Sequence, residues 1–266
     1  HFNNAQAEGV HTPFSFSEGG ETAYLRSGLN GVIGGYQASQ AFGASLSNIA
    51  FGRHLKSALD GGTDFVAMSV NTPGAANAYP LVGPVIINEI MYNPSSSNTG
   101  GEYLELYNLT DSPVALQDEV STEISPGHII KEMIPWKFSQ GIDFEFPAAT
   151  TIPARGYLIV AADPTAFTAY YGAMPSGVEV LGPFANNTAL SNSGELIQLV
   201  RPGDQEYGKK RYWICAEQVL YDDKAPWPIS PDGGGDCLRR KTPDTAGANY
   251  GNDVINWQAA APNPGR

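Results

Sequence analysis

The chain is poor in charge, in basic residues and in cysteine. Only 16% of its 266 residues are charged, against about a quarter in a typical globular protein. Lysine and arginine total 15 against 27 acidic residues, which gives a net charge of −12. This balance argues against a nucleic-acid binder and against a polybasic membrane-surface protein, because both need clustered cations. Two cysteines do not make a disulfide-stapled scaffold.

Long apolar runs and an initiator methionine are missing as well. No segment reaches the roughly 18 apolar residues of a membrane-spanning helix. The chain opens at His1 without a signal peptide, so we expect a fragment or mature product of a longer protein. Glycine (30), proline (20) and aromatic residues (11%) are abundant. This composition is typical of an all-β secreted protein and predicts an extracellular or cell-surface location.

The motifs of the common enzyme classes are absent. The four histidines, His1, His11, His54 and His128, are far apart and show no zinc-type spacing. There is no phosphate loop, no dinucleotide-binding glycine pattern and no nucleophile elbow. An enzyme would need an acid/base cluster in a pocket, and the sequence offers none. We therefore predict no catalytic residue and no certain cofactor.

Short strands between turn residues dominate the pattern, as expected for an all-β sandwich or barrel. One helix is predicted at Asp163–Tyr171, with Asp163 as N-cap, Pro164 as first helical residue and Gly172 as stop. A Pro/Gly/Ala-rich stretch at Asn71–Pro84 is interpreted as an interdomain linker. The predicted strands are Thr22–Arg26, Ile49–Arg53, Thr63–Ser69, Pro84–Met91, Glu102–Asn108, Asp143–Phe146, Gly156–Ala161, Leu196–Arg201, Arg211–Tyr221 and Cys237–Arg240.

The sequence also repeats itself, and this changes the predicted domain organisation. Three ordered matches with similar spacing disfavour chance similarity. We predict the C-terminal half of a domain at 1–78, a linker at 79–84 and a complete domain at 85–266. The matching pairs are Ser17–Leu25 with Ser191–Leu199, Phe51–Arg53 with Cys237–Arg239, and Asp64–Gly74 with Asn256–Gly265.

Seven short motifs of the complete unit carry a family resemblance. They are Val85–Pro94, Gly101–Asn108, Phe146-Pro147, Ile152–Tyr157, Leu190–Glu195, Pro226-Trp227-Pro228 and Asn256-Trp257. Together they resemble the lamin-tail domain in its bacterial secreted, tandem-repeat form, although no single motif is specific. A long insertion-like stretch, Gln117–Phe144, departs from the family pattern, and its role is open.

The resemblance implies an immunoglobulin-like β-sandwich, here preceded by a partial second sandwich. It implies a non-catalytic module of a large bacterial extracellular or cell-surface protein that acts in tethering, adhesion or protein–protein assembly. Other protein domains or copies of the same chain would be its partners. The alternative hypothesis is a carbohydrate-binding module that accompanies a secreted hydrolase, with a polysaccharide as partner.

Alternation along one motif strand predicts which side chains enter the core. Successive residues of a strand point to opposite faces. Leu104 and Leu106 are therefore expected to face the core, while Tyr103, Glu105 and Tyr107 face outward or line a neighbouring strand.

Carboxylates are candidate ligands for a structural calcium ion. Glu89 and Glu102 lie on two strands that are expected to pair, and Asp222 and Asp223 follow Tyr221. Several such oxygens would suit Ca²⁺, which takes 6–8 oxygen ligands. The alternative is that the glutamates hold loops through backbone N–H groups and the aspartates set turns.

Aromatic side chains are candidate glycan-stacking groups, because planar rings match the apolar face of a sugar. Trp136 and the pair Tyr170 and Tyr171 are the residues expected to be exposed for this purpose, with core packing as the alternative. The two cysteines, Cys215 and Cys237, form one disulfide if the compartment is oxidising, or remain two separate apolar residues.

Overall fold

A computed structural model describes residues 15–245 and 249–266, so the first part of the predicted half-domain lies outside the described residues. The N-terminal strands are β1 (Glu21–Leu29), β2 (Val32–Phe42), β3 (Phe51–Leu55) and β4 (Thr63–Ala67). They are followed by β5 (Val85–Met91), β6 (Tyr103–Asn108), β7 (Val114–Ala115), β8 (Gln117–Ser125), β9 (His128–Pro135), β10 (Lys137–Gln140), β11 (Phe144–Glu145) and β12 (Thr151–Ile152). The last elements are β13 (Tyr157–Ala161), helix α1 (Pro164–Tyr171), β14 (Glu179–Leu181), β15 (Glu195–Pro202), β16 (Trp213–Tyr221), β17 (Cys237–Arg240) and β18 (Trp257–Ala260).

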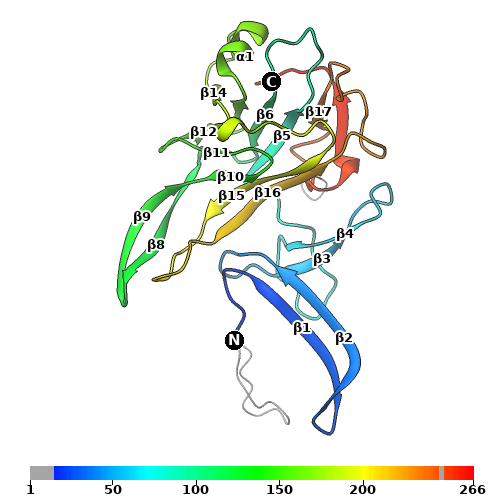
Figure 1. Cartoon of the computed structure of the whole chain (residues 1–266), viewed down its shortest axis with the longest axis vertical. Helices are drawn as coiled ribbons and strands as arrows, with labels where there is room; N and C mark the ends of the chain where they lie inside the picture. The colour runs from blue at the N-terminus through cyan, green and yellow to red at the C-terminus, as the bar shows by residue number, and fades with distance from the viewer. Residues whose placement is uncertain (1–14, 246–248) are drawn as a thin grey trace.

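Two sheets from residues 85–266 pack face to face (Figure 1). One has six strands in the order β14-β13-β6-β5-β17-β18, and the other has four in the order β11-β10-β15-β16. All neighbours are antiparallel except the pair β13 and β14. Antiparallel sheets joined across a shared apolar layer are the architecture of a β-sandwich. The predicted all-β, immunoglobulin-like fold is confirmed.

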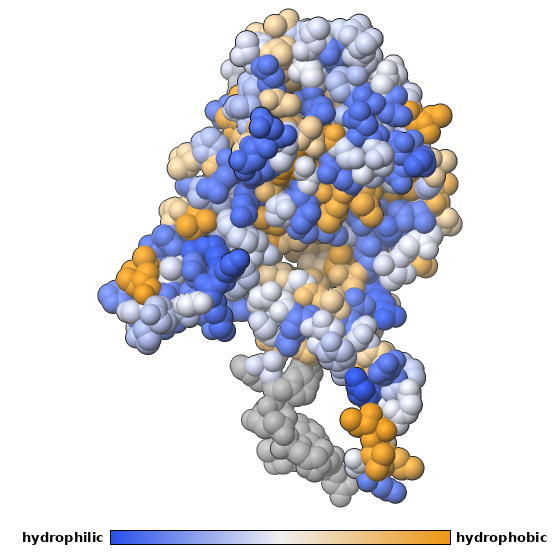
Figure 2. All heavy atoms as spheres, in the orientation of Figure 1, coloured by the Kyte–Doolittle hydropathy of each residue, from blue (hydrophilic) through white to orange (hydrophobic). Residues whose placement is uncertain are grey.

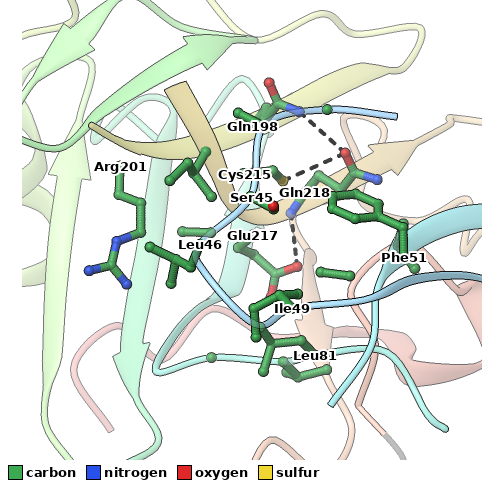
Figure 3. Close-up of a pocket in the computed structure, with 18 of the residues that line it drawn as sticks. Ser45, Leu46, Ile49, Phe51, Leu81, Gln198, Arg201, Cys215, Glu217 and Gln218 are labelled. Atoms are coloured by element: carbon green, nitrogen blue, oxygen red, sulfur yellow. Dashed lines mark hydrogen bonds between the residues drawn. The ribbon is translucent and has the colours of Figure 1, made fainter. Parts of the chain in front are cut away.

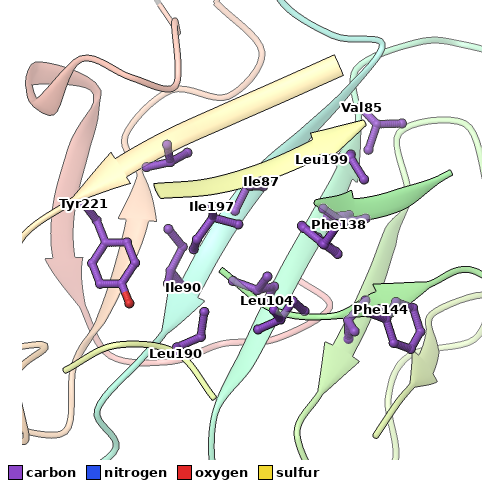
Figure 4. Close-up of a cluster of buried hydrophobic side chains, with 14 of the residues drawn as sticks. Val85, Ile87, Ile90, Leu104, Phe138, Phe144, Leu190, Ile197, Leu199 and Tyr221 are labelled. Carbon is purple, nitrogen blue, oxygen red and sulfur yellow. The ribbon is translucent and has the colours of Figure 1, made fainter. Parts of the chain in front are cut away.

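The core fills the space between these two sheets (Figure 4). Alternation places Leu104 and Leu106 of β6 in it, as predicted. In β5, a bulge after Ile87 shifts the register against β6, so that both Ile87 and Ile90 enter the core despite their spacing of three. From the opposite sheet, Leu199 meets them. Trp227 closes one end, with its ring centre 6.1 Å from that of Trp257.

The six-stranded sheet is buried on both of its faces, which the alternation pattern did not predict. Helix α1 covers the second face through Phe167, which packs with Tyr103 and other buried side chains. Tyr103 and Glu105 are therefore 0% exposed and Tyr107 is 5% exposed. The expectation that these three face outward is wrong, and its alternative, that they line neighbouring elements, is what the structure has.

Helix α1 begins and ends where local signals place it. The Asp163 carboxylate accepts from the backbone N–H groups of Thr165 and Ala166, and Pro164 occupies the first turn. Gly172 ends the helix with φ of +79°, a conformation that side chains with a Cβ avoid. The helix prediction is confirmed to within one residue.

The insertion-like stretch forms an arm and contributes to the core. Strands β8 and β9 pair as a long hairpin that projects from the sandwich, and β10 then joins β15 in the second sheet (Figure 1). Between β9 and β10 stands Trp136, which is buried in the core. The stretch thus supplies an inner strand and an aromatic anchor.

Residues 21–67 form two further hairpins, β1–β2 and β3–β4, outside the two sheets of the sandwich. The β1–β2 hairpin extends away from the rest of the molecule (Figure 1). Its turn is Asn30-Gly31, with φ of +49° and +79°, as the strand twist of a two-residue hairpin requires. The Asn71–Pro84 stretch contains no named strand and connects β4 to β5. The assignment of 1–78 as half a domain stays a prediction.

Candidate functional site

A groove separates the N-terminal hairpins from the outer face of strands β15 and β16 (Figure 3). Its volume is about 640 Å³. One wall carries apolar side chains of the N-terminal part, and the other carries side chains of β15 and β16. The lining includes Leu46, Ile49, Phe51, Phe65, Leu81, Gln198, Arg201, Trp213, Ile214, Cys215 and Gln218. An apolar groove with a few polar groups is suited to binding another apolar surface.

The polar groups of the groove lie together on the wall formed by β15 and β16. Gln198 Nε2 donates to Gln218 Oε1 at 3.3 Å, and Cys215 Sγ approaches the same oxygen at 3.8 Å. The Gln218 backbone N–H donates to Glu217 Oε1 at 2.9 Å. No histidine is among the described residues that line the groove, so Cys215 has no neighbouring base there. This set can bind polar backbone groups, but it is not a nucleophile–base pair.

A buried ion pair lies behind this wall and joins the two sheets. Glu217 Oε2 accepts from Arg240 Nη2 at 2.9 Å, and both side chains are almost completely buried. The guanidinium also donates to the Ile87 carbonyl at 3.0 Å and lies 4.5 Å from the centre of the Trp257 ring. Burial raises the pKa of Glu217 to about 6, although Arg240 opposes this shift. The wall of the groove is thus fixed from behind.

Two aspartate carboxylates, each accepting two hydrogen bonds, attach the N-terminal hairpins to the sandwich. The Asp253 carboxylate accepts from Ser57 N at 2.7 Å and from Ser57 Oγ at 2.6 Å. Asp64 of β4 accepts from Tyr250 Oη at 2.8 Å and from Asn252 Nδ2 at 2.9 Å. These contacts hold the β3–β4 hairpin, whereas the β1–β2 hairpin remains exposed along most of its length.

A second buried acidic group lies under the C-terminal segment. Glu89 and Glu105 are paired neighbours on β5 and β6, and both are 0% exposed. Tyr103 Oη donates to Glu89 at 2.8 Å, and the Gly265 backbone N–H donates to Glu105 at 2.6 Å. Arg239 Nη1 lies 3.7 Å from Glu89. Burial, and for Glu105 also the charge of Glu89, raise both pKa values, that of Glu105 to about 8.

This acidic pair predicts that the protein is more stable in mild acid. A carboxyl whose pKa is raised by folding contributes stability that is present below its unfolded pKa and is lost as the pH rises through its folded pKa. The free energy of unfolding is therefore expected to fall between pH 4.5 and 8, by at most about 1.4 kcal/mol per pH unit for one proton. Urea unfolding of the parent and of Glu105→Gln across this range measures the effect. The variant should show a flatter pH profile, and equal slopes would contradict the assignment.

The four predicted calcium ligands are not brought together. Glu102 accepts from the Leu190 backbone N–H at 2.7 Å, and Asp222 accepts from Lys224 N at 3.1 Å. Asp223 lies 3.6 Å from the Lys224 ammonium, and Glu89 belongs to the buried pair described above. Within residues 15–245 and 249–266, no three His, Cys, Asp or Glu side chains are arranged to hold a metal ion. Glu102 and Asp222 thus hold a loop and a turn, as in the alternative, whereas Glu89 accepts from a tyrosine hydroxyl and Asp223 lies beside a lysine.

The predicted glycan-stacking residues do not form a platform. Trp136 is 1% exposed, so the expectation of an exposed ring is wrong. Its indole N–H donates to Asp118 at 2.7 Å and its ring lies against Arg201, because the arm folds it inward. Tyr170 is 45% exposed, but its ring meets that of Tyr171 edge-on at 77°. Two rings that stack on one sugar face need to be nearly coplanar.

The two cysteines are not bonded to each other. Cys215 is exposed on β16, while Cys237 is buried on β17 in the opposite sheet. The predicted disulfide is therefore wrong, because the sandwich core separates the two strands. The alternative, two separate thiols, is what the structure has.

The sequence pattern did not reveal the most exposed apolar surface of the part of the chain that the structure describes. Strand β2 was not predicted, although the dipeptide Asn30-Gly31 is a strong hairpin signal. Large apolar side chains of this hairpin are 63–76% exposed, and none of them belongs to either buried hydrophobic cluster of the described residues. They are Tyr24, Leu25, Leu29, Val32, Ile33 and Tyr36. Figure 2 shows apolar residues gathered near the free end of the hairpin.

Comparison with known proteins places the sandwich in a family. No curated protein and no solved structure gives a significant match to the chain. Residues 80–210, about half of the chain, match the sequence model of the Lamin Tail Domain family. The match begins before β5 and extends beyond β15, so it includes strands from both sheets. The members of this family are immunoglobulin-like binding or structural domains that are not known as enzymes. Residues 80–210 of the chain therefore form a domain of the Lamin Tail Domain family.

Proposed function

We propose that this chain is a non-catalytic module of an extracellular or cell-surface protein, and that it acts in tethering, adhesion or protein–protein assembly. The observation that carries the proposal is the β1–β2 hairpin, whose six large apolar side chains are at least 63% exposed. Soluble monomers rarely leave a contiguous apolar surface uncovered unless it binds something. A hairpin of two strands also leaves one edge of each strand unpaired.

Composition supports a location outside the cell. The chain is acidic, rich in glycine and proline, and low in charged residues. None of the described helices has the length and apolarity that crossing a bilayer requires. A net charge of −12 keeps copies apart by repulsion, so that contact is left to specific surfaces.

The β8–β9 arm offers a second exposed surface for assembly. Ile124 is 50% exposed, Ile129 is 61% exposed and Met133 is 51% exposed. Arg211 Nη2 holds the middle of this arm through Thr122 Oγ1 and Glu132 Oε1, both at 2.7 Å. The arm is therefore a fixed projection that presents apolar side chains at a distance from the sandwich.

The proposal predicts that copies of the chain associate through the β1–β2 hairpin. We expect concentration-dependent association in sedimentation experiments, weakened about tenfold or more, which is 1.4 kcal/mol, by the double variant Leu29→Lys with Ile33→Lys. The control variant, Gln37→Lys with Ser39→Lys, adds the same charge to exposed polar positions of the same hairpin and is expected to associate like the parent. Equal association of all three proteins would contradict the proposed role of the hairpin.

A further inference from the structure

The turn that opens strand β1 is the same as the turn that opens strand β15. Ser17 N donates to Glu21 Oε1 at 2.5 Å, and Ser191 N donates to Glu195 Oε1 at 2.6 Å. In both turns, the glycine before the glutamate has a left-handed φ, +88° at Gly20 and +91° at Gly194. That glycine N–H donates to the carbonyl of the first serine in each case. The likeness between the two sequences thus extends to individual hydrogen bonds.

The strands that follow the two turns also correspond. β1 pairs with β2 and β3 pairs with β4, as β15 pairs with β16 and β17 pairs with β18, and all four pairs are antiparallel. Each glutamate faces an aromatic residue at the end of the partner strand, Phe42 for Glu21 and Tyr221 for Glu195. Residues 15–74, here called the N-terminal unit, therefore have the strand order of the last four strands of the sandwich.

The N-terminal unit and the last four strands of the sandwich differ in which strands pair with their outer edges. In the sandwich, β10 pairs with the outer edge of β15, and β5 pairs with the outer edge of β17. In the N-terminal unit, no described strand pairs with the corresponding edge of β1 or of β3. Unpaired edges of this kind accept a strand from elsewhere.

Burial shows the same difference on the apolar face. Leu199 of β15 is 0% exposed, because the first half of the sandwich covers it, whereas its counterpart Leu25 of β1 is 66% exposed. In the sandwich, the apolar face of β15 is covered by strands such as β5, β6 and β10. Strands of the same kind would cover the corresponding face of β1.

Arg53 and Gly74 of the N-terminal unit also lack the polar partners that the matching residues of the sandwich have. Arg239 of β17 lies 3.7 Å from Glu89 of β5, whereas Arg53 of β3 is exposed and forms no ion pair with a described residue. Gly265 is buried, with φ of +80°, and donates to Glu105 of β6. Gly74 has φ of +75° in the matching Pro-Gly turn, but a Cβ added there would meet nothing within 4 Å.

We propose that the N-terminal unit is the acceptor half of a second lamin tail sandwich and binds a polypeptide segment of the kind formed by residues 85–190. That segment places a strand like β10 along β1 and a strand like β5 along β3. Its two strand glutamates face Arg53 and the Pro-Gly turn at Gly74. This inference rests on the proposed assembly function and names the class of partner.

The experiment adds such a segment to the chain. Residues 80–190 of this sequence are fused through a flexible linker ahead of residue 1, and amide hydrogen exchange is followed in β1 and β3. We expect exchange in these strands to slow by about 100-fold relative to the chain extended by a linker alone, because their edges become paired. Strands β15 and β17 of the original sandwich report on whether that sandwich stays intact.

Matched variants make the result specific. Leu25→Lys in the fused chain is expected to abolish the new protection in β1, while Leu220→Lys, at an exposed position of β16, leaves it unchanged. Unchanged exchange in β1 and β3 of the fused chain, with β15 and β17 still protected, would overturn the inference. Equal protection in the linker-only chain, at a concentration where sedimentation shows a monomer, would also overturn it, because the added segment would then not be the cause. Neither result decides whether the parent chain associates through its hairpin, which the sedimentation experiment tests separately.

Discussion

Replacing Arg240 with alanine is expected to lower the free energy of unfolding by about 3–5 kcal/mol. The change leaves the Glu217 carboxylate buried without its cation, and it removes the donors to the Ile87 and Asn249 carbonyls. It also removes the cation that lies over the Trp257 ring. Urea unfolding at neutral pH, followed by tryptophan fluorescence, measures the loss.

Two further variants separate the buried ion pair from a general effect of removing charge. Arg155 pairs with Asp111 and Asp244 but is 45% exposed, so Arg155→Ala is expected to cost much less than Arg240→Ala. The double variant Arg240→Met with Glu217→Leu is expected to recover part of the loss, because no unpaired charge remains buried. A cost for Arg240→Ala no greater than that for Arg155→Ala would show that the pair does not hold the sheets together.

Trp136→Ala is expected to destabilise the sandwich by about 3–5 kcal/mol. The ring is 1% exposed in the core between the sheets, and the deletion leaves a cavity that rigid neighbouring strands fill only in part. It also leaves Asp118 with one donor fewer at the base of the arm. The midpoint of thermal or urea unfolding gives the effect directly.

An exposed aromatic residue supplies the comparison for Trp136. Tyr170→Ala removes a ring that is 45% exposed on helix α1, and we expect a cost within about 1 kcal/mol. A glycan-binding role for Trp136 would give the opposite pattern, with lost sugar binding and unchanged stability. That pattern would contradict the core assignment of this residue.

Helix α1 and the core residues of β6 could be predicted because neighbouring residues in the sequence determine them. The helix follows from the Asp163 cap, the Pro164 start and the Gly172 stop, all of which act within one turn. Alternation in β6 was enough to assign Leu104 and Leu106 to the core. Strand β2 was not predicted because Val32–Phe42 is rich in glycine, alanine, serine and glutamine, which have weak strand preference. Its pairing with β1, not its composition, makes it a strand.

Features that depend on how layers stack could not be read from the sequence. Tyr103 and Glu105 are buried because α1 and the C-terminal segment cover the second face of the sheet, and nothing in β6 itself encodes that cover. Cys215 and Cys237 are close in sequence but lie on opposite sheets, which only the strand order reveals. Trp136 looked like an insertion residue, yet the arm returns it to the core.

The strand order has a consequence for synthesis on the ribosome. β5 is paired on one edge by β17, which is translated much later, after every strand from β6 to β16 has emerged. During that interval β5 has an open edge, and β3, whose sequence resembles that of β17, has already left the ribosome. In the nascent chain, β5 can therefore pair with β3 before β17 is made. The fused chain offers the same two partners to a strand like β5.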